Sequence, residues 1–301
     1  MYIYVNGEIL ERSKATISPF DHGYMYGLGL FETMRIYNGH PFLLDDHLSR
    51  LQSGLSLLNI EWTYSKEDVL TILNELLQKN NLQNAYVRLN VSAGVGEIGL
   101  QVEAYTHPSF IVYVKPMPDK KTPLVKEGVI LETKRNTPES NERLKSHHYL
   151  NNILAKREVG NDMNKEGIFL TKEGFLAEGI VSNLFFVKGK TVFTPAIETG
   201  ILNGITRQFI CKLLSAKGIF VKEGFFTLSE LLESEEIFMT NSIQEIFAIH
   251  KVGEKEFKTG EQTLTYTLQR QYEKYTSYLW SKEDVRKEVL DDKNGSKWSI
   301  Y

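Results

Sequence analysis

The chain has 301 residues, a length that favours two domains; 42% of them are hydrophobic and 11% aromatic, so we expect a substantial core and exclude a disordered chain. Lys and Arg total 35 against 38 Asp and Glu, a formal net charge of −3, and this balance argues against a nucleic-acid partner, which usually needs a basic face. The N-terminal segment has no basic stretch before a long apolar run, and no segment reaches the ~18–20 apolar residues of a membrane helix, so we expect a cytoplasmic protein with no membrane partner.

Two Asn-Gly pairs, Asn6-Gly7 and Asn38-Gly39, each lie between short apolar segments and predict β-hairpins. Ser65 and Asp68 resemble a capping box for a helix that runs through Leu77. An earlier helix is predicted by leucines at helical spacing, at positions 48, 51, 55 and 58. Two later strands are predicted from β-rich composition at 86–92 and 110–114.

Three prolines, Pro116, Pro118 and Pro123, interrupt all periodicity and predict a linker. The final residues are polar and offer few apolar anchors, so we expect them to be peripheral. The predicted organisation is a small N-terminal α+β domain at 1–115, a linker at 116–125, a larger domain at 126–280 and a polar tail at 281–301.

The larger domain is predicted to contain a strand at 129–133, a helix at 148–159, a hairpin-rich stretch at 168–194 and a helix at 204–217. The last helix carries Cys211, the one cysteine of the chain. One cysteine cannot form an internal disulfide, and its apolar surroundings predict a buried, inert thiol.

Two patterns point to ligands that we do not expect. The segment Gly94–Gly99 matches GxGxxG, a dinucleotide-binding pattern, but the sequence after it is too short for a crossover helix and ends at Pro108. We therefore predict a mobile glycine loop. His147 and His148 are adjacent, and adjacent side chains on a helix point about 100° apart, so a shared metal ion is not expected.

Seven short motifs carry the strongest functional signal, because they occur in one order along most of the chain. They are Asp21-His22-Gly23, the segment Gly27–Arg35, the segment His47–Leu51, Lys145-Ser146-His147-His148-Tyr149-Leu150, Ala177-Glu178-Gly179 with Ser182-Asn183-Leu184-Phe185, Gly204-Ile205-Thr206-Arg207, and Thr240-Asn241-Ser242 with Gln244-Glu245-Ile246.

In this order and spacing the motifs resemble the fold-type IV pyridoxal-phosphate enzymes, which include branched-chain aminotransferases, D-amino-acid aminotransferases and aminodeoxychorismate lyases. The resemblance extends from about Met1 to about Phe257. It implies an α+β chain with a small N-terminal α+β domain and a larger, α/β barrel-like C-terminal domain. It also implies pyridoxal 5′-phosphate as the cofactor and a homodimer as the assembly.

The resemblance assigns three residues to the cofactor ring. Lys145 matches the lysine that bonds covalently to the cofactor, although a lysine in a polar stretch is otherwise usually a solvated surface charge. Glu178 matches the carboxylate that faces the pyridine nitrogen; without the motif it is a glutamate at a hairpin bend. Tyr149 resembles the phenol that binds the cofactor oxygen in branched-chain enzymes, with a spacing that departs by one residue from theirs.

Four further residues match the phosphate site. Arg50 matches the family arginine of the H-x-x-R-L segment, and a guanidinium can bind phosphate with two hydrogen bonds. Ile205 and Thr206 lie where a helix is predicted to begin, so their backbone amides would point at the anion. Without the motif, Thr206 is equally well explained as a helix cap. Ser242 matches a phosphate-contacting Ser or Thr of relatives.

Within the family, Thr33 and the segment 92–100 resemble the aminodeoxychorismate lyases. Branched-chain enzymes carry Gly in place of Thr33, and D-amino-acid enzymes carry a Pro-Arg-x-His carboxylate trap where this chain has Gly94–Gly99. Enterobacterial lyases carry an arginine where Ala93 stands, so we assign the substrate carboxylate to Arg88, whose counterpart in branched-chain relatives has that role.

The implied reaction converts 4-amino-4-deoxychorismate to 4-aminobenzoate and pyruvate, a step toward folate, with Lys145 moving the C4 proton and Thr33 assisting a proton transfer. Three alternatives stay open at this point. They are an aminotransferase for branched-chain or D-amino acids, a non-catalytic cofactor-binding module, and a nucleotide-dependent oxidoreductase that uses the Gly94–Gly99 loop.

Overall fold

A computed structural model describes residues 1–117 and 124–285. The described chain forms two compact units, and each is treated by itself. The first contains residues 1–117, 144–148 and 276–280, and the second contains 124–143, 149–275 and 281–285. The predicted linker at 116–125 falls largely outside the described residues, as does most of the predicted tail at 281–301, so the predicted domain boundaries stay predictions.

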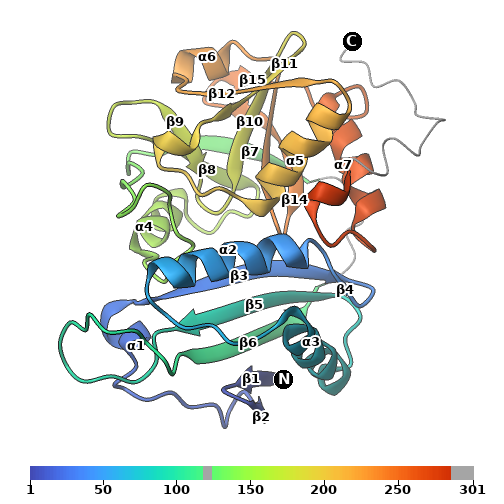
Figure 1. Ribbon diagram of the computed structural model, residues 1–301. Helices are drawn as coiled ribbons and strands as arrows, with labels where there is room; N and C mark the ends of the chain where they lie inside the picture. Colours follow the sequence, from blue (N-terminus) through green and yellow to red (C-terminus); the bar gives the residue numbers. More distant parts are fainter. Residues whose placement is uncertain (118–123, 286–301) are drawn as a thin grey trace. The chain divides into compact units, whose positions relative to one another are not determined.

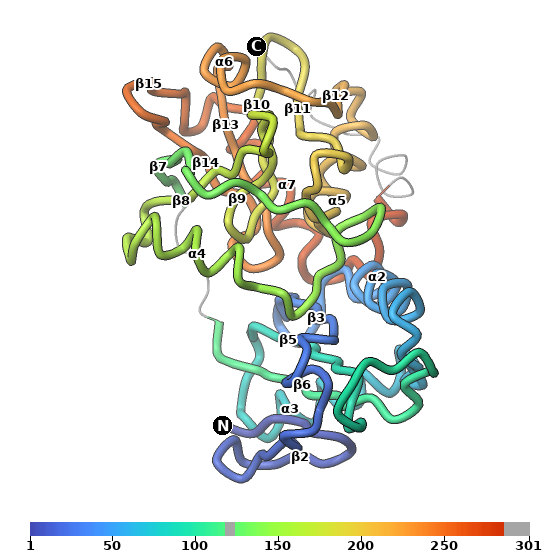
Figure 2. The backbone as a smooth tube through the Cα atoms, turned by 90° about the vertical axis from the view of Figure 1, so that its left-hand side faces the viewer, coloured from blue at the N-terminus to red at the C-terminus, as the bar shows by residue number. Residues whose placement is uncertain are grey.

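The first unit is built on a six-stranded antiparallel sheet with the strand order β2-β1-β6-β5-β3-β4 (Figures 1 and 2). Its strands are β1 Tyr2–Val5, β2 Glu8–Glu11, β3 Gly29–Tyr37, β4 His40–Pro41, β5 Ala85–Ser92 and β6 Ser109–Pro116, and its helices are α1 His22–Tyr26, α2 Leu44–Leu57 and α3 Lys66–Asn80.

Local sequence signals account for the joints of this unit. Asn6, Asn38 and the glycines that follow them all have positive φ, as a type I′ turn requires, so both predicted hairpins are confirmed. Ser65 and Asp68 form the predicted capping box at the start of α3. The helix continues three residues past the predicted end, to Asn80, and Asn81 closes it in the left-handed region.

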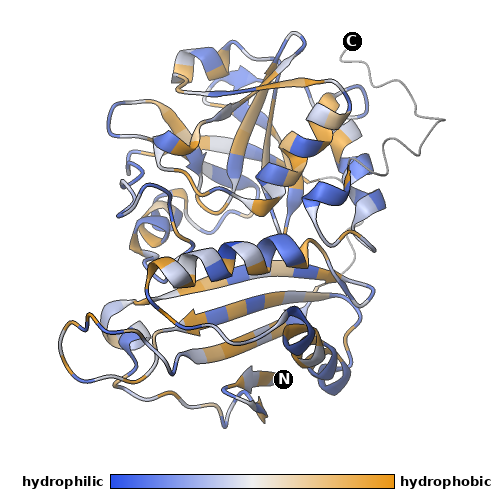
Figure 3. Ribbon diagram, viewed as in Figure 1, coloured by the Kyte–Doolittle hydropathy of each residue, from blue (hydrophilic) through white to orange (hydrophobic). Residues whose placement is uncertain are grey.

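The two faces of the first sheet differ because side chains alternate along each strand. On one face, Met34 and Val87 are fully buried in a core to which α2 and α3 also contribute. Phe31, Thr33 and Arg88 point to the opposite face, because they are one residue out of phase with those core positions. Figure 3 shows this alternation as bands of hydrophobic and hydrophilic residues along the strands.

The second unit contains a nine-stranded mixed sheet with the order β12-β11-β10-β13-β14-β7-β8-β9, and β15 pairs with β14. Its strands are β7 Val125–Ile130, β8 Lys165–Leu170, β9 Leu176–Gly179, β10 Asn183–Lys188, β11 Thr191–Pro195, β12 Phe220–Gly224, β13 Glu236–Asn241, β14 Glu245–Val252 and β15 Lys255–Glu256.

This sheet closes on itself because β9 also pairs with β10, through Asn183 and Glu178. The ring β10-β13-β14-β7-β8-β9 results, and it is the barrel-like feature expected of the larger domain. The α+β fold with a barrel-like second sheet is therefore confirmed.

Helices surround the second sheet (Figure 1). They are α4 Leu150–Val159, α5 Ile205–Ala216, α6 Leu228–Leu232 and α7 Leu264–Tyr275, with short 3₁₀ turns at Ile197–Thr199 and Lys282–Asp284. The predicted helices at 148–159 and 204–217 are confirmed to within two residues. The predicted strand at 129–133 instead runs from Val125 to Ile130, because its partners β8 and β14 set its length, and α7 was not predicted.

Candidate active site

Lys145 is held by the edge of β3 in the first unit. The Phe31 amide donates to the Lys145 carbonyl at 2.9 Å, the His147 amide donates to the Gly29 carbonyl at 3.0 Å, and Ser146 pairs with Leu30. This strand-like pairing fixes the backbone position of Lys145 relative to β3. Its Nζ lies 4.5 Å from the centroid of the Phe31 ring.

Arg88 and Thr33 belong to the same unit as this lysine. The register of β3 and β5 places Thr33 directly opposite Arg88, so the two side chains share one face of the sheet. The Arg88 guanidinium stacks 3.6 Å from the Phe31 centroid, and its Nε and Nη2 donate to Asn90 Oδ1 at 3.2 and 3.1 Å. The Phe31 ring thus contacts the side-chain nitrogen of Lys145 and the guanidinium of Arg88.

His147 occupies space that a glycine provides. A Cβ at Gly29 would lie 2.4 Å from its Cε1, so only glycine admits the ring at this position. Burial, and then the charge of Arg88, lower the pKa of His147 to about 4. The imidazole is therefore neutral at physiological pH and adds no third positive charge beside Lys145 and Arg88.

Arg50, the predicted phosphate ligand, is fixed on α2 by a buried carboxylate. Its Nε and Nη2 donate to Glu32 Oε1 and Oε2, both at 2.7 Å, and His47 Nδ1 lies 2.6 Å from Glu32 Oε2. Burial raises the pKa of Glu32, but Arg50 and His47 outweigh it and hold the pKa at about 2. Glu32 thus engages Nε and Nη2 of the Arg50 guanidinium and fixes its orientation.

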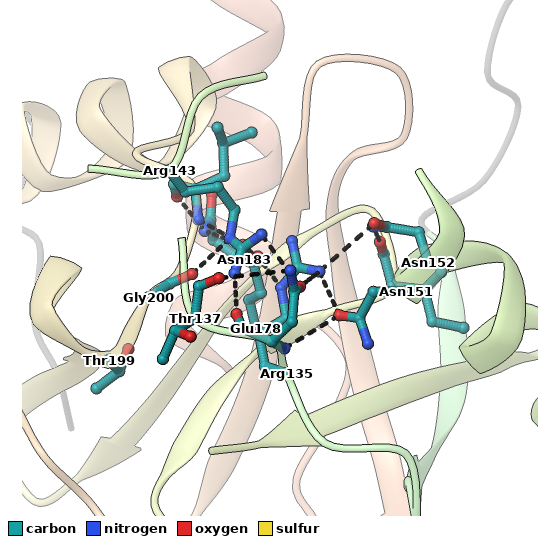
Figure 4. A network of polar contacts seen from close by, with 12 residues as sticks. Arg135, Thr137, Arg143, Asn151, Asn152, Glu178, Asn183, Thr199 and Gly200 are labelled. Atoms are coloured by element: carbon teal, nitrogen blue, oxygen red, sulfur yellow. Dashed lines mark hydrogen bonds and ion pairs between the residues drawn. The ribbon is translucent and has the colours of Figure 1, made fainter. Parts of the chain in front are cut away.

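Glu178 is the centre of a polar network in the second unit, and its side chain is buried (Figure 4). Its Oε1 accepts from Arg135 Nε at 2.9 Å, and its Oε2 accepts from Asn183 Nδ2 at 3.2 Å and from the Leu202 amide at 3.0 Å. A carboxylate offers about four acceptor positions, so the three bonds leave capacity for one more donor.

Two arginines converge on this carboxylate. Arg143 Nε lies 3.9 Å from Glu178 Oε1 and donates to the Gly200 carbonyl. Burial, and then the neighbouring Arg135, lower the pKa of Arg143 to about 10, and Glu178 partly offsets this effect. Arg135 also donates through Nη1 to Asn151 Oδ1 at 2.6 Å, which ties Glu178 to α4. Tyr149 immediately precedes that helix as its N-cap residue.

The start of α5 lies next to this network. Gly204 is the N-cap residue, so the alternative explanation of Thr206 as the helix cap is wrong: Ile205 and Thr206 occupy the first turn, where backbone amides face outward from the helix end. A Cβ at Gly204 would lie 2.0 Å from Asn183 Oδ1. Glycine is therefore required for α5 to begin this close to the partner of Glu178.

Ser242 lies in the tight turn between β13 and β14. Asn241 Oδ1 accepts from the amides of Ile243 and Gln244 at 2.9 and 2.7 Å, which fixes the turn. Thr240, two residues before Ser242, pairs with Asn183 across β10 and β13. Asn183 thus links the strand before Ser242, the Glu178 carboxylate and the start of α5.

Sequence reasoning did not assign roles to Asn183, Arg135 or Arg143. Asn183 belongs to the motif Ser182–Phe185, so the sequence did mark its segment as functional. The two arginines carry no local pattern; they reach Glu178 from a segment without helix or strand, between β7 and α4, which only the tertiary structure brings there.

The structure also bears on the remaining candidates. No helix follows Gly99 before β6 begins at Ser109, so the GxGxxG segment lacks the helix that a dinucleotide site requires. Cys211 is half-buried, not buried as predicted, but burial still raises the pKa of its thiol to about 11, as expected for an inert cysteine. Within residues 1–117 and 124–285, no His, Cys, Asp and Glu cluster suited to a metal ion is found, and none of the helices is long and apolar enough to cross a membrane.

Comparisons with known proteins agree with this geometry. The family model of amino-transferase class IV matches residues 29–252. An aminodeoxychorismate lyase of Bacillus subtilis is 45% identical over 98% of this chain and 98% of its own. A D-alanine aminotransferase of Listeria monocytogenes is 31% identical over 87% of this chain and 91% of its own.

Solved structures show the same fold. The 4-amino-4-deoxychorismate lyase of Pseudomonas aeruginosa has a TM-score of 0.80 at 26% identity and covers 92% of this chain and 100% of its own. The branched-chain aminotransferase of Escherichia coli has a TM-score of 0.80, also at 26% identity, over 92% and 95% of the two chains. The chain belongs to the amino-transferase class IV family.

Proposed function

We propose that this chain is a pyridoxal-phosphate-dependent lyase that converts 4-amino-4-deoxychorismate to 4-aminobenzoate and pyruvate, a step toward folate. The 45% identity with the Bacillus subtilis lyase over nearly the full length of both chains supports this assignment. At 31%, identity with the D-alanine aminotransferase of Listeria monocytogenes is much lower.

In this proposal, seven residues would bind the cofactor. Lys145 would bond covalently to the cofactor, Glu178 would accept the pyridine N–H at its fourth acceptor position, and Tyr149 would bind the phenolic oxygen. The phosphate would be held by Arg50, by Ser242 and by the Ile205 and Thr206 amides at the uncapped start of α5.

When bound, the cofactor supplies an electron sink for the carbon that bears the substrate amine. Lys145 would remove the proton from C4 of the substrate. The bond between C3 and the ether oxygen then breaks, the enolpyruvyl group takes up a proton and leaves as pyruvate, and the ring becomes aromatic. Thr33 would hold a proton close to the departing oxygen, and Arg88 would bind a substrate carboxylate.

One observation favours elimination over amino transfer. Thr33 lies directly opposite Arg88 in the β3–β5 register, on the face where Lys145 also contacts Phe31. This register supports a hydroxyl on the same sheet face as the arginine proposed to bind the substrate carboxylate. Branched-chain enzymes, which only return the proton to the cofactor, have glycine at this position by the resemblance described above.

The test is incubation of the purified enzyme with enzymatically made 4-amino-4-deoxychorismate and no keto-acid acceptor. We expect 4-aminobenzoate, followed by fluorescence, and pyruvate, followed by a coupled dehydrogenase, in equal amounts. A parallel reaction with D-alanine or leucine and 2-oxoglutarate should be slow. Rapid amino transfer with no 4-aminobenzoate would assign the chain to the aminotransferases instead.

A further inference from the structure

We propose that Lys126 and Glu166 are positioning residues that hold the two cofactor-binding turns of the second unit in a fixed relation to each other. One is the Glu178–Ser182 turn, whose first residue carries the carboxylate proposed for the pyridine nitrogen. The other is the Asn241–Gln244 turn, which contains Ser242. The inference rests on the proposed cofactor site but concerns residues that do not touch the cofactor.

The first link runs from Glu166 to the Glu178–Ser182 turn. Glu166 Oε1 accepts from the Ser182 hydroxyl at 3.0 Å and from the Ile180 amide at 3.2 Å. The turn is itself closed by the Gly179 amide, which donates to the Ser182 carbonyl at 2.7 Å. A Cβ at Gly179 would lie 2.1 Å from Ser182 Oγ and 2.8 Å from Glu166 Oε1, so the carboxylate packs directly on the turn.

The second link runs from Lys126 to the Asn241–Gln244 turn. Lys126 Nζ donates to Gln244 Oε1 at 3.2 Å and lies 4.8 Å from the Phe247 ring centroid at the start of β14. Asn241 Nδ2 also donates to Gln244 Oε1, at 3.4 Å. Lys126 therefore binds Gln244, the last residue of the turn.

The two links join in one buried ion pair, because Lys126 Nζ lies 3.4 Å from Glu166 Oε2. Each residue is 5% exposed. A buried ion pair is not a dependable source of stability, since desolvation of both charges opposes their attraction, and an apolar pair of equal volume often does as well. The pair instead orients the two turns: Lys126 donates its other hydrogen bond to the Asn241–Gln244 turn, and Glu166 accepts its other hydrogen bonds from the Glu178–Ser182 turn.

The same two strands provide a matched control. Lys165 and Glu127, each adjacent in sequence to a member of the buried pair, form an ion pair of 3.7 Å between β8 and β7, but their side chains are 37% and 36% exposed. The control pair has the same charges on the same strands. Among the described residues, the control pair makes no hydrogen bond or ion pair with either turn, so only the buried pair should influence them.

The experiment compares Lys126→Met with Lys165→Met in the cofactor-loaded enzyme. We expect Lys126→Met to weaken pyridoxal phosphate about tenfold or more, measured by equilibrium dialysis and the visible absorbance of the bound cofactor. Amide hydrogen exchange in the Glu178–Ser182 and Asn241–Gln244 turns should accelerate together. Lys165→Met should leave the affinity and both turns at wild-type values.

Single-link variants separate the two turns. Gln244→Leu should loosen the Asn241–Gln244 turn alone and weaken pyridoxal phosphate more than pyridoxal, which lacks the phosphate. Ser182→Ala should loosen the Glu178–Ser182 turn and weaken both compounds equally. If Lys126→Met does not fold, Lys126→Met/Glu166→Gln, which leaves no charge buried alone, takes its place.

Equal cofactor affinity in the Lys126 and Lys165 variants would overturn the inference, as would faster exchange spread evenly over β7 and β8, which marks a merely structural role. The proposed function fails separately. If the wild type binds pyridoxal phosphate but makes no 4-aminobenzoate, the lyase assignment is wrong and the positioning result stands. If the wild type binds no cofactor, the site itself is wrong, whatever the exchange data show.

Discussion

Phe31 organises the reactive residues of the first unit at the scale of single side chains. Its ring contacts the ammonium of Lys145 and the guanidinium of Arg88, while its amide fixes the Lys145 carbonyl. The Arg88 guanidinium is a permanent cation that attracts anionic substrates, and the neutral His147 adds no further positive charge beside it. The assignment of Lys145 can be tested at this scale.

Lys145→Ala should fold normally yet retain no cofactor after borohydride reduction, because the amine that forms the covalent bond is gone. Lys156→Ala, a lysine on the exposed surface of α4, is the control and should be labelled like the wild type. Peptide mass spectrometry locates the reduced adduct in the wild type. An adduct on any other lysine would refute the assignment.

Arg50→Ala should weaken cofactor binding by about 1.5–3 kcal/mol, the usual value of a charge-assisted hydrogen bond. Titration of the cofactor-free protein measures this directly. Arg12→Ala removes the same charge from an exposed position and should bind as the wild type does. Unchanged affinity in Arg50→Ala would exclude a phosphate contact at this residue.

The same arginine should govern stability in acid. The pKa of Glu32 is about 2 in the folded protein against an ordinary 4.5, so its contribution to stability is complete above about pH 4.5 and is lost as the pH falls toward 2. Arg50→Ala removes the largest of the interactions that lower the pKa of Glu32, so the folded-state pKa rises. We expect acid unfolding, followed by circular dichroism, to move to higher pH than in Arg12→Ala.

The Asp21-His22-Gly23 motif acts at the scale of an element, the Gly94–Gly99 loop. Asp21 accepts from the hydroxyls of Ser92 and Ser109 at 2.9 and 2.6 Å, which secures the two strand ends that flank the loop. His22 is fully buried; its Nε2 donates to the Glu97 carbonyl at 2.9 Å, and its Nδ1 forms a hydrogen bond with the Tyr105 hydroxyl at 3.0 Å.

The predicted mobile loop is therefore anchored at one point, the Glu97 carbonyl, by its hydrogen bond with His22. Gly96→Ala should release it, because the added Cβ would lie 2.6 Å from His22 Nε2 and compete with the bond to Glu97. We expect amide exchange at Gly99 and its neighbours to rise roughly tenfold, equivalent to ~1.4 kcal/mol. Ile98→Ala, which changes an exposed side chain of the same loop, should not alter the exchange.

The whole molecule presents apolar side chains that a monomer usually buries. Ile98, Leu100 and Val102 are 76%, 92% and 88% exposed within one segment. Exposed apolar side chains that gather in one segment are typical of an interaction surface, and the homodimer implied by the family resemblance offers an occupant for it.

Light scattering should therefore give twice the chain mass of 34.6 kDa, about 69 kDa. Leu100→Asp with Val102→Asp should shift the protein toward the monomer, because it would bury two new charges at the interface. Leu57→Asp, which adds a charge at an exposed leucine of α2, is the control. A wild type that remains monomeric at high concentration would contradict the assembly.

Most joints of the fold were predictable because their causes are local. Asn-Gly turns need positive φ, Ser65 and Asp68 satisfy each other within three residues, and leucine spacing follows the helical period, so neighbours in sequence suffice to specify them. The helix α7 was not predicted because its buried face mixes polar and apolar residues, so Leu268 and Tyr272 do not form a clear apolar repeat.

The sequence alone also determined the family, because seven motifs in one order identify a cofactor chemistry even when each is weak. It could not show that Glu178 is gripped by Arg135 and Arg143, or that Lys126 and Glu166 join two distant turns. Those contacts join residues up to 118 positions apart. They exist because the packed sheet pairs β7 with β8 and with β14 and closes β9 on β10, and this pairing is a property of the whole sheet, not of any segment within it.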